Sequence, residues 1–246
     1  MAKENEIRSF DNITDEQIRC ILGWPFLHPN RGKYLMEIGC IMPLLPPPPA
    51  KLLDLGCGVG WTSVFFARSG YEVTGVDIAE NKLCLANKIA ARENPGKLCF
   101  ITGDYEMLEF DCEFDCAVFF DSLHHAENEQ AAVESVFRAL KPGGVCITVE
   151  PGIFHSRRQA SIEAVKHKGT TEKDMPPFKI IRAGKKAGFT NFRIFPQPGA
   201  LYSVIYGQTD RKLLAKIIKV PLLRALAGAF LILVYPRFSG VVVMNK

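Results

Sequence analysis

No two of the eight cysteines in this 246-residue sequence form a C-x-x-C pair, and they are scattered from Cys20 to Cys146. Zinc ribbons and disulfide-stapled secreted domains both need regularly spaced cysteines, so neither class fits. Scattered cysteines are typical of proteins in a reducing compartment. The sequence therefore predicts no metal site and a cytoplasmic location.

An apolar leader is also missing. The first ten residues, MAKENEIRSF, include acidic residues and no apolar core, so we expect no signal peptide. The uninterrupted apolar run at 225–235 is shorter than the roughly 20 residues that a membrane-spanning helix needs. With 48% hydrophobic and 23% charged residues, the composition is that of an ordinary globular protein.

Acidic residues are scarce in the last third of the sequence. Residues 151–246 contain 17 Lys/Arg against four Asp/Glu, whereas residues 1–150 contain 13 against 22. The overall net charge of +4 hides this asymmetry. A positive segment can attract an anionic partner, such as a phosphorylated substrate, a lipid headgroup or nucleic acid, or it can simply be a solvated basic face.

Apolar runs alternate with helical patterns through the middle of the chain. Short continuous apolar strands between helices are typical of a parallel sheet covered on both faces. We predict an α/β fold: a doubly wound, mostly parallel seven-stranded sheet with its ligand at the carboxyl ends of the strands. The predicted strands are 51–55, 72–76, 98–102, 114–120, 145–150, 191–195 and 240–244, and the predicted helices are 60–69, 79–92, 127–140 and 177–187, after a helical region at about 14–45.

The strongest motif is a glycine-rich loop, Gly56-Cys-Gly-Val-Gly60, between a predicted strand and a predicted helix. Glycines let the backbone turn sharply and approach a ligand closely, and the helix that follows points its free N–H groups at that ligand. Asp77 ends the second strand, where an acidic side chain can accept both hydroxyls of a ribose. Trp61 stands where the dinucleotide fingerprint needs glycine or alanine, so a dinucleotide is not favoured.

Together with Asp54, two residues before the first glycine, this loop resembles that of the class I S-adenosylmethionine-dependent methyltransferases with the seven-stranded Rossmann-like fold, in the type 11 or quinone-biosynthesis-like branch. The resemblance covers residues 51–151 and includes Asp77, Asp104, the run 119–125 and the segment 140–144. It implies S-adenosyl-L-methionine as cofactor and S-adenosyl-L-homocysteine as product.

The resemblance also implies which residues bind the cofactor. Asp54 and the loop glycines face its amino acid end, Asp77 its ribose, and Asp104 its adenine amino group, although Asp104 could instead cap a turn. Arg31 or Tyr34 would meet the cofactor carboxylate from an N-terminal lid. The predicted cofactor-binding set is Arg31, Tyr34, Asp54, Gly56, Cys57, Gly58, Gly60, Asp77, Ile78, Asp104, Tyr105 and Phe120, with Cys57 a filler of the loop rather than a reactive thiol.

Methyl transfer from this cofactor needs few catalytic groups from the protein. The sulfonium is already activated, so the protein holds the acceptor near the methyl carbon and excludes water. An acceptor hydroxyl also needs a base. The candidates are His124 and His125 after the fourth strand and Glu150 at the end of the fifth, with His155 a weaker one. The histidines could equally shape the pocket, and Glu150 could bond backbone; without a third ligand they do not predict a metal.

Residues 199–239 interrupt the alternation. The segment 211–220 places Leu213, Leu214, Ile217 and Ile218 on one helical stripe, with its cations mostly elsewhere. Three interpretations stay open: a lid or a homo-oligomer contact, a basic amphipathic helix in peripheral membrane contact through 211–235, or a structural cap. We expect one domain, with a helical lid at 1–48, a cofactor-binding core at 49–198, a helical insert at 199–239 and the last strand at 240–246.

We therefore predict an S-adenosylmethionine-dependent methyltransferase that acts on a small-molecule or lipid- or glycan-linked acceptor, most readily at oxygen. The alternatives are a C-methyltransferase of a quinone-type lipid, a nonenzymatic S-adenosylmethionine-binding protein and a dinucleotide oxidoreductase. A nucleic-acid substrate is not favoured, because the sequence has no Asn-Pro-Pro-aromatic tetrapeptide.

Overall fold

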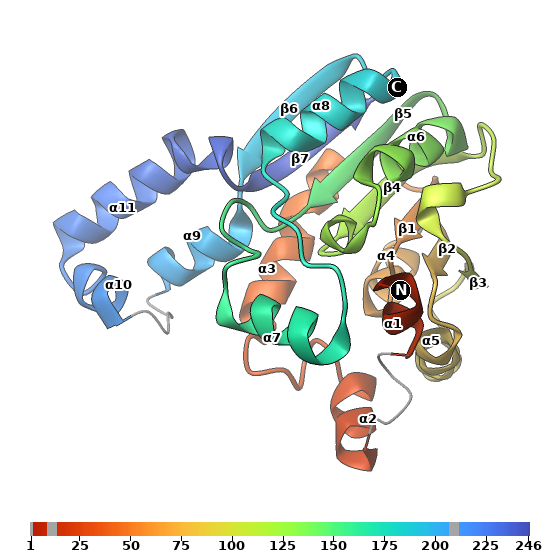
Figure 1. Cartoon of the computed structure of the whole chain (residues 1–246), viewed down its shortest axis with the longest axis horizontal. Coiled ribbons are helices and arrows are strands. Elements are labelled where there is room, and N and C mark those ends of the chain that lie inside the picture. The colour runs from red at the N-terminus through yellow and green to blue at the C-terminus, as the bar shows by residue number, and fades with distance from the viewer. Residues whose placement is uncertain (1, 9–13, 207–211) are drawn as a thin grey trace.

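A seven-stranded sheet runs through the centre of the computed structural model, which describes residues 2–8, 14–206 and 212–246 (Figure 1). The strand order is β3-β2-β1-β4-β5-β7-β6, and β7 runs in the opposite direction to the other six strands. This confirms the predicted α/β fold with a mostly parallel seven-stranded sheet. The strands are β1 (Lys51–Leu55), β2 (Glu72–Asp77), β3 (Leu98–Thr102), β4 (Phe114–Phe120), β5 (Leu140–Val149), β6 (Asn191–Pro196) and β7 (Gly240–Asn245).

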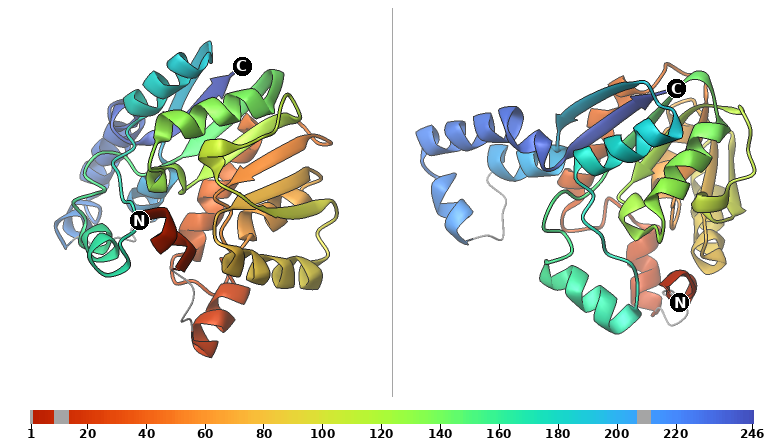
Figure 2. Two further views of the ribbon diagram at one scale, coloured as in Figure 1. Left: turned by 45° about the vertical axis from the view of Figure 1, so that its right-hand side comes forward. Right: turned by 45° about the horizontal axis from the view of Figure 1, so that its top comes forward.

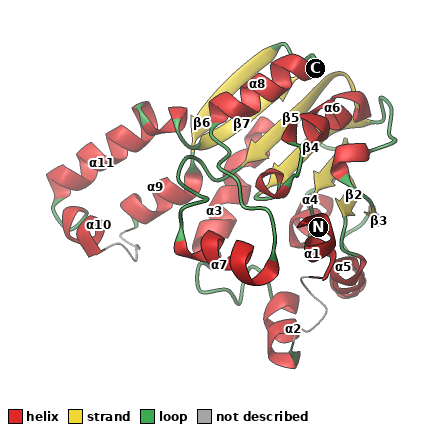
Figure 3. Ribbon diagram, in the orientation of Figure 1, coloured by secondary structure: helices red, strands yellow, loops and turns green. Residues whose placement is uncertain are grey.

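Helices flank the sheet on both sides, as Figure 3 shows with helices in red and strands in yellow. The helices are α1 (Ala2–Arg8), α2 (Asp15–Leu22), α3 (Arg31–Ile41), α4 (Trp61–Arg68), α5 (Glu80–Glu93), α6 (Glu129–Ala139), α7 (Gln159–Lys168), α8 (Pro177–Ala187), α9 (Pro198–Ile205), α10 (Lys212–Ile217) and α11 (Pro221–Leu233). Short 3₁₀ turns are η1 (Met42–Leu44), η2 (Tyr105–Met107), η3 (Leu123–His125) and η4 (Tyr235–Arg237).

The core has two layers because strand residues alternate between faces. In β4, Ala117 and Phe119 pack into the cluster formed with α6 and α8. Cys116, Val118 and Phe120 pack into the opposite cluster with α3 and α4. Both faces are therefore apolar, which explains why the strand reads as one continuous apolar run.

The N-terminal helical region forms as predicted, but it is more than a cover. The side chain of Thr14 accepts a hydrogen bond from the Gln17 amide, and the Gln17 side chain accepts one from the Thr14 amide; this capping box starts α2. Ile38 and Ile41 of α3 are fully buried against the sheet. Part of the predicted lid therefore supplies core, and its role as a lid stays a prediction.

Some elements differ from the sequence-based expectation. β5 begins at Leu140 rather than near residue 145, with a register shift opposite Phe114 and Cys116. Gly143, with a φ of +78°, lets the strand bulge there. Helix α1 lies within the predicted helical lid at 1–48, ahead of the helical region expected at about 14–45, and α7 was not predicted.

The segment between β6 and β7 is helical, as expected. It contains α9, α10, α11 and η4, and α11 extends away from the sheet in the right-hand view of Figure 2. Arg211, one of the cations considered above, lies outside the described residues, and the side chains of residues 212–214 are not described either. Among the described residues, no helix combines the length and apolar character needed to cross a bilayer.

Candidate active site

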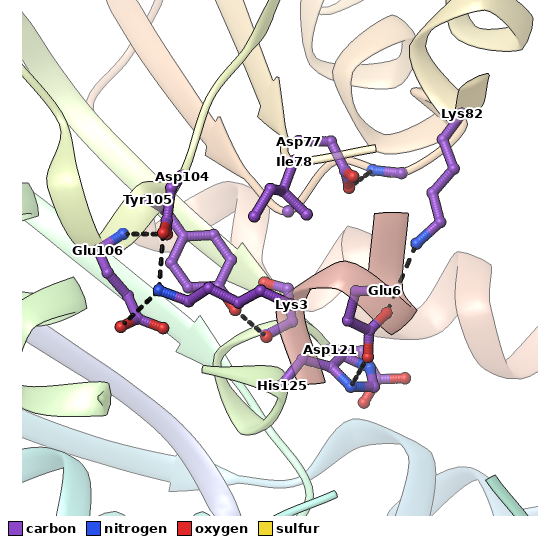
Figure 4. Close-up of a pocket in the computed structure, with 13 residues that line it drawn as sticks. Lys3, Glu6, Asp77, Ile78, Lys82, Asp104, Tyr105, Glu106, Asp121 and His125 are labelled. Atoms are coloured by element: carbon purple, nitrogen blue, oxygen red, sulfur yellow. Dashed lines mark hydrogen bonds and ion pairs between the residues drawn. The ribbon is translucent and has the colours of Figure 1, made fainter. Parts of the chain in front are cut away.

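A cavity of about 170 Å³ lies at the carboxyl ends of the parallel strands (Figure 4). Its walls come from the glycine loop after β1, the end of β2, the turn after β3, the turn after β4, and α1. The position agrees with the ligand site expected for an open α/β sheet. The predicted residues that line it are Gly56, Gly58, Asp77, Ile78, Asp104, Tyr105 and His125.

The glycine loop and Asp77 form one hydrogen-bonded unit. The Gly58 amide donates to Asp77 Oδ2 at 2.8 Å, and the Ala79 amide donates to Asp77 Oδ1 at 2.9 Å. Gly58 has a φ of +55°, and a Cβ placed on it would meet no atom within 4 Å. The backbone is therefore in a glycine-favoured conformation and faces open space.

Asp104 caps a turn, one of the two roles that the sequence left open, and its contact with adenine stays a prediction. Its Oδ1 accepts a hydrogen bond from the Glu106 amide at 2.9 Å, which caps η2, and its carboxylate also lines the cavity. Beside it, the Tyr105 hydroxyl donates to the Ser122 carbonyl at 3.0 Å, which fixes the ring at the cavity wall. Ile78 lies across the cavity from Tyr105 in Figure 4.

Helix α1 closes one side of the cavity through charged contacts. Lys3 Nζ lies 2.7 Å from Asp104 Oδ2 and 3.0 Å from Glu106 Oε2. Glu106 in turn accepts from the Glu127 and Asn128 amides at 2.8 and 3.1 Å, so α1 is tied to the start of α6. No sequence pattern indicates this contact, because α1 is short, polar and about 100 residues away from Asp104.

Substituting Lys3 with alanine should loosen α1. Two ion pairs of partly exposed side chains contribute about 1 kcal/mol together, so amide hydrogen exchange in Ala2–Arg8 should accelerate about fivefold, as measured by mass spectrometry. Lys97→Ala removes an exposed ion pair with Glu72 and serves as control. Equal exchange in Lys3→Ala and the unsubstituted protein would show that these ion pairs do not hold the helix.

Six predicted cofactor residues lie outside the lining of this cavity. Asp54 is buried, and its Oδ2 accepts from the Thr62 and Ser63 hydroxyls, both at 2.6 Å, at the start of α4. Burial raises the pKa of Asp54 to about 6; these two hydrogen bonds oppose the shift, and the charge of Asp77 adds to it. The Cys57 side chain packs with Leu83 and Ala86, as a filler of the loop would.

Three more of these residues, Tyr34, Phe120 and Arg31, lie outside the glycine loop. Tyr34 lies 4.9 Å from Trp24 and 6.2 Å from Trp61, between ring centroids, and Phe120 stacks edge-on with Trp61 at 5.4 Å. Burial raises the pKa of Tyr34 to about 12, and the negative charge of Asp121 contributes. Arg31 is exposed at the start of α3. Gly60, the last of the six residues outside the cavity lining, caps α4 with a φ of +77°. Cofactor contacts of these residues stay predictions.

Glu150 and His124 form a buried pair behind the turn after β4. Glu150 Oε1 accepts from the Ser122 and Leu123 amides at 3.0 and 2.7 Å, and Oε2 accepts from the His124 amide at 3.2 Å. The same Oε2 lies 2.8 Å from His124 Nδ1. A carboxylate with this set of partners fixes both the turn and the orientation of the imidazole ring.

Glu172 and His125 lie next to His124 and form a cluster with it. Glu172 Oε2 lies 4.0 Å from His124 Nε2 and 2.7 Å from His155 Nε2. His125 Nδ1 lies 2.7 Å from the Thr171 carbonyl and 3.3 Å from Glu6 Oε1. The sequence did not single out Glu172, because no motif or periodicity marks the loop that carries it.

This cluster also has the donor atoms of a metal site. Ligand atoms of His124, His125 and Glu172 lie within 4.8 Å of one another, and so do those of Asp121, His124 and Glu150. Imidazole and carboxylate groups suit a divalent cation. The sequence predicted no metal because only the two adjacent histidines were in view. In the folded structure Glu172 lies close enough to be a third ligand.

The pKa of His125 makes stability depend on pH. Burial opposes protonation, but the hydrogen bond and charge of Glu6, with Glu172 and the Thr171 carbonyl, outweigh it and raise the pKa to about 9. A raised histidine pKa stabilises the fold fully below the unfolded value of about 6.5, and this stabilisation is lost as pH rises through 9. Because the side chain is 31% exposed, solvent screens part of the effect.

We therefore expect the thermal unfolding midpoint to fall between pH 6.5 and 9.5 by more in the unsubstituted protein than in His125→Gln. Differential scanning fluorimetry in one buffer series measures both profiles. Parallel profiles would mean that His125 does not carry this pH dependence.

The residues of the cavity fit the cofactor that the resemblance implies. Asp77 keeps acceptor capacity for a ribose beyond its two amide contacts, because each carboxylate oxygen has two lone pairs. Ile78 and Tyr105 can border an adenine ring, and Asp104 can accept its amino group. At Gly58 the backbone faces open space, where the amino acid end of the cofactor would approach.

Part of the chain is similar to known methyltransferases. Residues 52–144 match the family described as "Methyltransferase domain". The chain is 37% identical over 106 residues to "Putative methyltransferase YqeM" of Bacillus subtilis, 36% over 108 to "S-adenosyl-L-methionine-dependent Diels-Alderase iccD" of Talaromyces variabilis, and 35% over 101 to "Ubiquinone biosynthesis O-methyltransferase" of Idiomarina loihiensis. These matches cover 41%, 42% and 38% of this chain and 42%, 37% and 39% of the relatives, so the chain spans less than half the length of each.

The fold is matched over a longer stretch. The crystal structure of geranyl diphosphate C-methyltransferase from Streptomyces coelicolor, in complex with Mg²⁺, geranyl-S-thiolodiphosphate and S-adenosyl-L-homocysteine, has a TM-score of 0.66 at 15% identity and covers 100% of this chain and 98% of that one. The glycine loop, Asp77 and Asp104 all lie inside the segment that matches a methyltransferase domain, and together with the fold this supports the predicted class I, Rossmann-like S-adenosylmethionine-dependent methyltransferase.

Proposed function

We propose that this enzyme transfers the methyl group of S-adenosylmethionine to a hydroxyl oxygen of a small-molecule or lipid- or glycan-linked acceptor, with His124 as general base. The observation that carries the proposal is the buried contact of 2.8 Å between His124 Nδ1 and Glu150 Oε2 at the carboxyl edge of the sheet. A hydroxyl must lose its proton as it attacks, and a positioned histidine is the usual acceptor of such a proton.

The cavity residues would hold the cofactor, which supplies the activated methyl group when bound. Asp77 would accept the ribose hydroxyls, Asp104 the adenine amino group, and the Gly56 and Gly58 backbone would border the amino acid end. Helix α1 would exclude water from this side through Lys3 and its two carboxylate partners.

The contact with Glu150 orients the His124 ring. With Nδ1–H donated to Glu150, the lone pair of Nε2 is available to take a proton from the acceptor. Glu150 and Glu172 flank the ring, so a carboxylate lies close to each ring nitrogen. Glu150 is thus a positioning residue in this proposal, since its oxygens bond to groups of the chain itself.

Two observations support the proposed class of acceptor: the positive charge of residues 151–246 and the names of similar proteins. Residues 151–246, which hold 17 Lys/Arg against four Asp/Glu, favour an anionic acceptor or an acceptor at an anionic surface. Several relatives with about 30–35% identity are named ubiquinone biosynthesis O-methyltransferases. A lipid-like phenol or another hydroxyl compound is consistent with both.

The test is a methylation assay with isotopically labelled S-adenosylmethionine on fractionated metabolite and lipid extracts. The expected product carries the label as a methyl ether, identified by mass spectrometry and by the carbon shift of the new methyl group. Label on carbon would instead support the quinone-type C-methyltransferase, and label in nucleic acid alone would contradict a small-molecule acceptor.

A second candidate is cofactor-dependent catalysis without methyl transfer. It is favoured by one relative, named an S-adenosyl-L-methionine-dependent Diels-Alderase, at 36% identity over 108 residues. The discriminating measurement is S-adenosylhomocysteine release during turnover of an identified substrate. Stoichiometric release supports methylation, whereas conversion of the substrate without release supports the second candidate.

A further inference from the structure

Helix α11 exposes most of its apolar side chains. No residue of Pro221–Leu233 is buried, although all but one of its residues are apolar or glycine. Leu233 is 73% exposed and Leu222 is 69% exposed. A helix that only packed on its own fold would bury an apolar stripe and expose a polar one. The exposed large side chains are Leu222, Leu223, Leu226, Phe230, Ile232 and Leu233.

The helix projects from the body of the protein. It contacts α9, η4 and β6, and it extends away from the β6 edge of the sheet in Figures 1 and 2. The exposed apolar side chains are therefore free to meet an external surface. Contiguous exposed apolar patches of this kind mark interaction sites.

The charge around α11 is of one sign. From residue 211 to the end, the sequence has seven Lys/Arg and no Asp or Glu. Of these cations, Lys216, Lys219 and Arg224 are exposed on or next to α10 and α11. An apolar helix surrounded by cations alone has the composition of an element that lies in the interface of an anionic membrane.

The same charge argues against a second copy of this chain as the partner. Two copies joined through α11 would bring both sets of cations together with no acidic residue of this segment to compensate them. An anionic lipid surface fits both the cations and the exposed apolar side chains. Its headgroups attract the cations, and the leucines can insert among its acyl chains.

A spanning arrangement does not fit the length of the helix. Thirteen residues at about 1.5 Å per residue give roughly 20 Å, whereas the hydrocarbon core of a bilayer is about 30 Å thick. We propose that α11, with Lys216, Lys219 and Arg224, binds flat in the interface of a membrane rich in anionic lipid. This proposal is independent of which acceptor the enzyme methylates.

The test is sedimentation of the full chain with vesicles of phosphatidylcholine containing 30% phosphatidylglycerol, compared with vesicles of phosphatidylcholine alone. We expect binding to the anionic vesicles at low salt and at least tenfold weaker binding in 0.5 M NaCl or to neutral vesicles. The combined variant Leu222→Gln, Leu226→Gln and Leu233→Gln should bind at least tenfold more weakly, with an unchanged thermal unfolding midpoint because these side chains are exposed.

Matched controls separate α11 from general surface properties. Phe178→Gln removes an apolar side chain that is equally exposed on α8, and the combination of Lys166→Gln, Lys168→Gln and Lys186→Gln removes three exposed cations from α7 and α8. Neither should reduce binding by more than twofold. Lys216→Gln with Lys219→Gln and Arg224→Gln should abolish the preference for anionic vesicles.

Three results would overturn the proposal. The first is no sedimentation with anionic vesicles at low salt. The second is an equal loss of binding in the α7 and α8 controls. The third is a dimer in light scattering that the leucine variant converts to a monomer, without vesicle binding by either protein; that result would assign α11 to contact between copies.

Discussion

Replacing His124 with alanine is expected to lower the rate of methyl transfer by about 10²–10⁴-fold, the usual contribution of a positioned general base. The affinity for S-adenosylmethionine should stay within twofold, because His124 does not line the cavity that would hold the cofactor. Initial rates with the identified acceptor and calorimetric titration with the cofactor measure the two quantities separately.

His167→Ala is the matched control, since it removes an exposed histidine from α7. It should leave rate and binding unchanged. Unchanged turnover in His124→Ala, with the protein folded, would contradict the role of His124 as general base.

Treatment with EDTA distinguishes a base from a metal ligand. If His124, His125 and Glu172 held an essential cation, activity would fall on chelation and return when the metal is added back. If His124 acts as a base without a metal, chelation should leave the activity unchanged.

Replacing Asp77 with asparagine is expected to weaken S-adenosylhomocysteine binding by about 10–100-fold. Hydrogen bonds to a charged group contribute about 1.5–3 kcal/mol, and the amide cannot supply the acceptors that the ribose and the Gly58 and Ala79 amides require together. Isothermal titration calorimetry checks the affinity, and the maximal rate at saturating cofactor should change far less.

Asp115→Asn is the control for this substitution. Asp115 follows Phe114 at the opposite end of β4, where it pairs with Lys141 and accepts from the Lys51 amide. Cofactor affinity should be unaffected by its loss. Equal affinities of Asp77→Asn and the unsubstituted protein would show that Asp77 does not contact the ligand.

The same titrations with NAD test the alternative that the cavity binds a dinucleotide. We expect no binding of NAD.

The sequence predicts the sheet well because the relevant information is local. The three leucines of Lys51–Leu55 form a strand that is buried on both faces, and the glycine loop that follows can only be a tight turn. The strand ends then bring Asp77, Asp104 and the 121–125 turn to one edge, whichever helices lie between them.

The contacts around the site could not be read in the same way. Lys3 reaches Asp104 across 101 positions of sequence, and Glu172 reaches His124 through a loop without periodicity. Nothing in a heptapeptide such as AKENEIR shows where it docks. Asp54 illustrates the converse: the motif points to a cofactor contact, while the fold satisfies one of its oxygens with two hydroxyls of α4.

A crystal structure of the protein grown with S-adenosylhomocysteine tests the central claim most directly. We expect the adenosine between Ile78 and Tyr105, with the ribose hydroxyls on the Asp77 carboxylate and the amino acid end against Gly58. A ligand bound elsewhere, with no density beside Asp77, would contradict the assignment of this cavity.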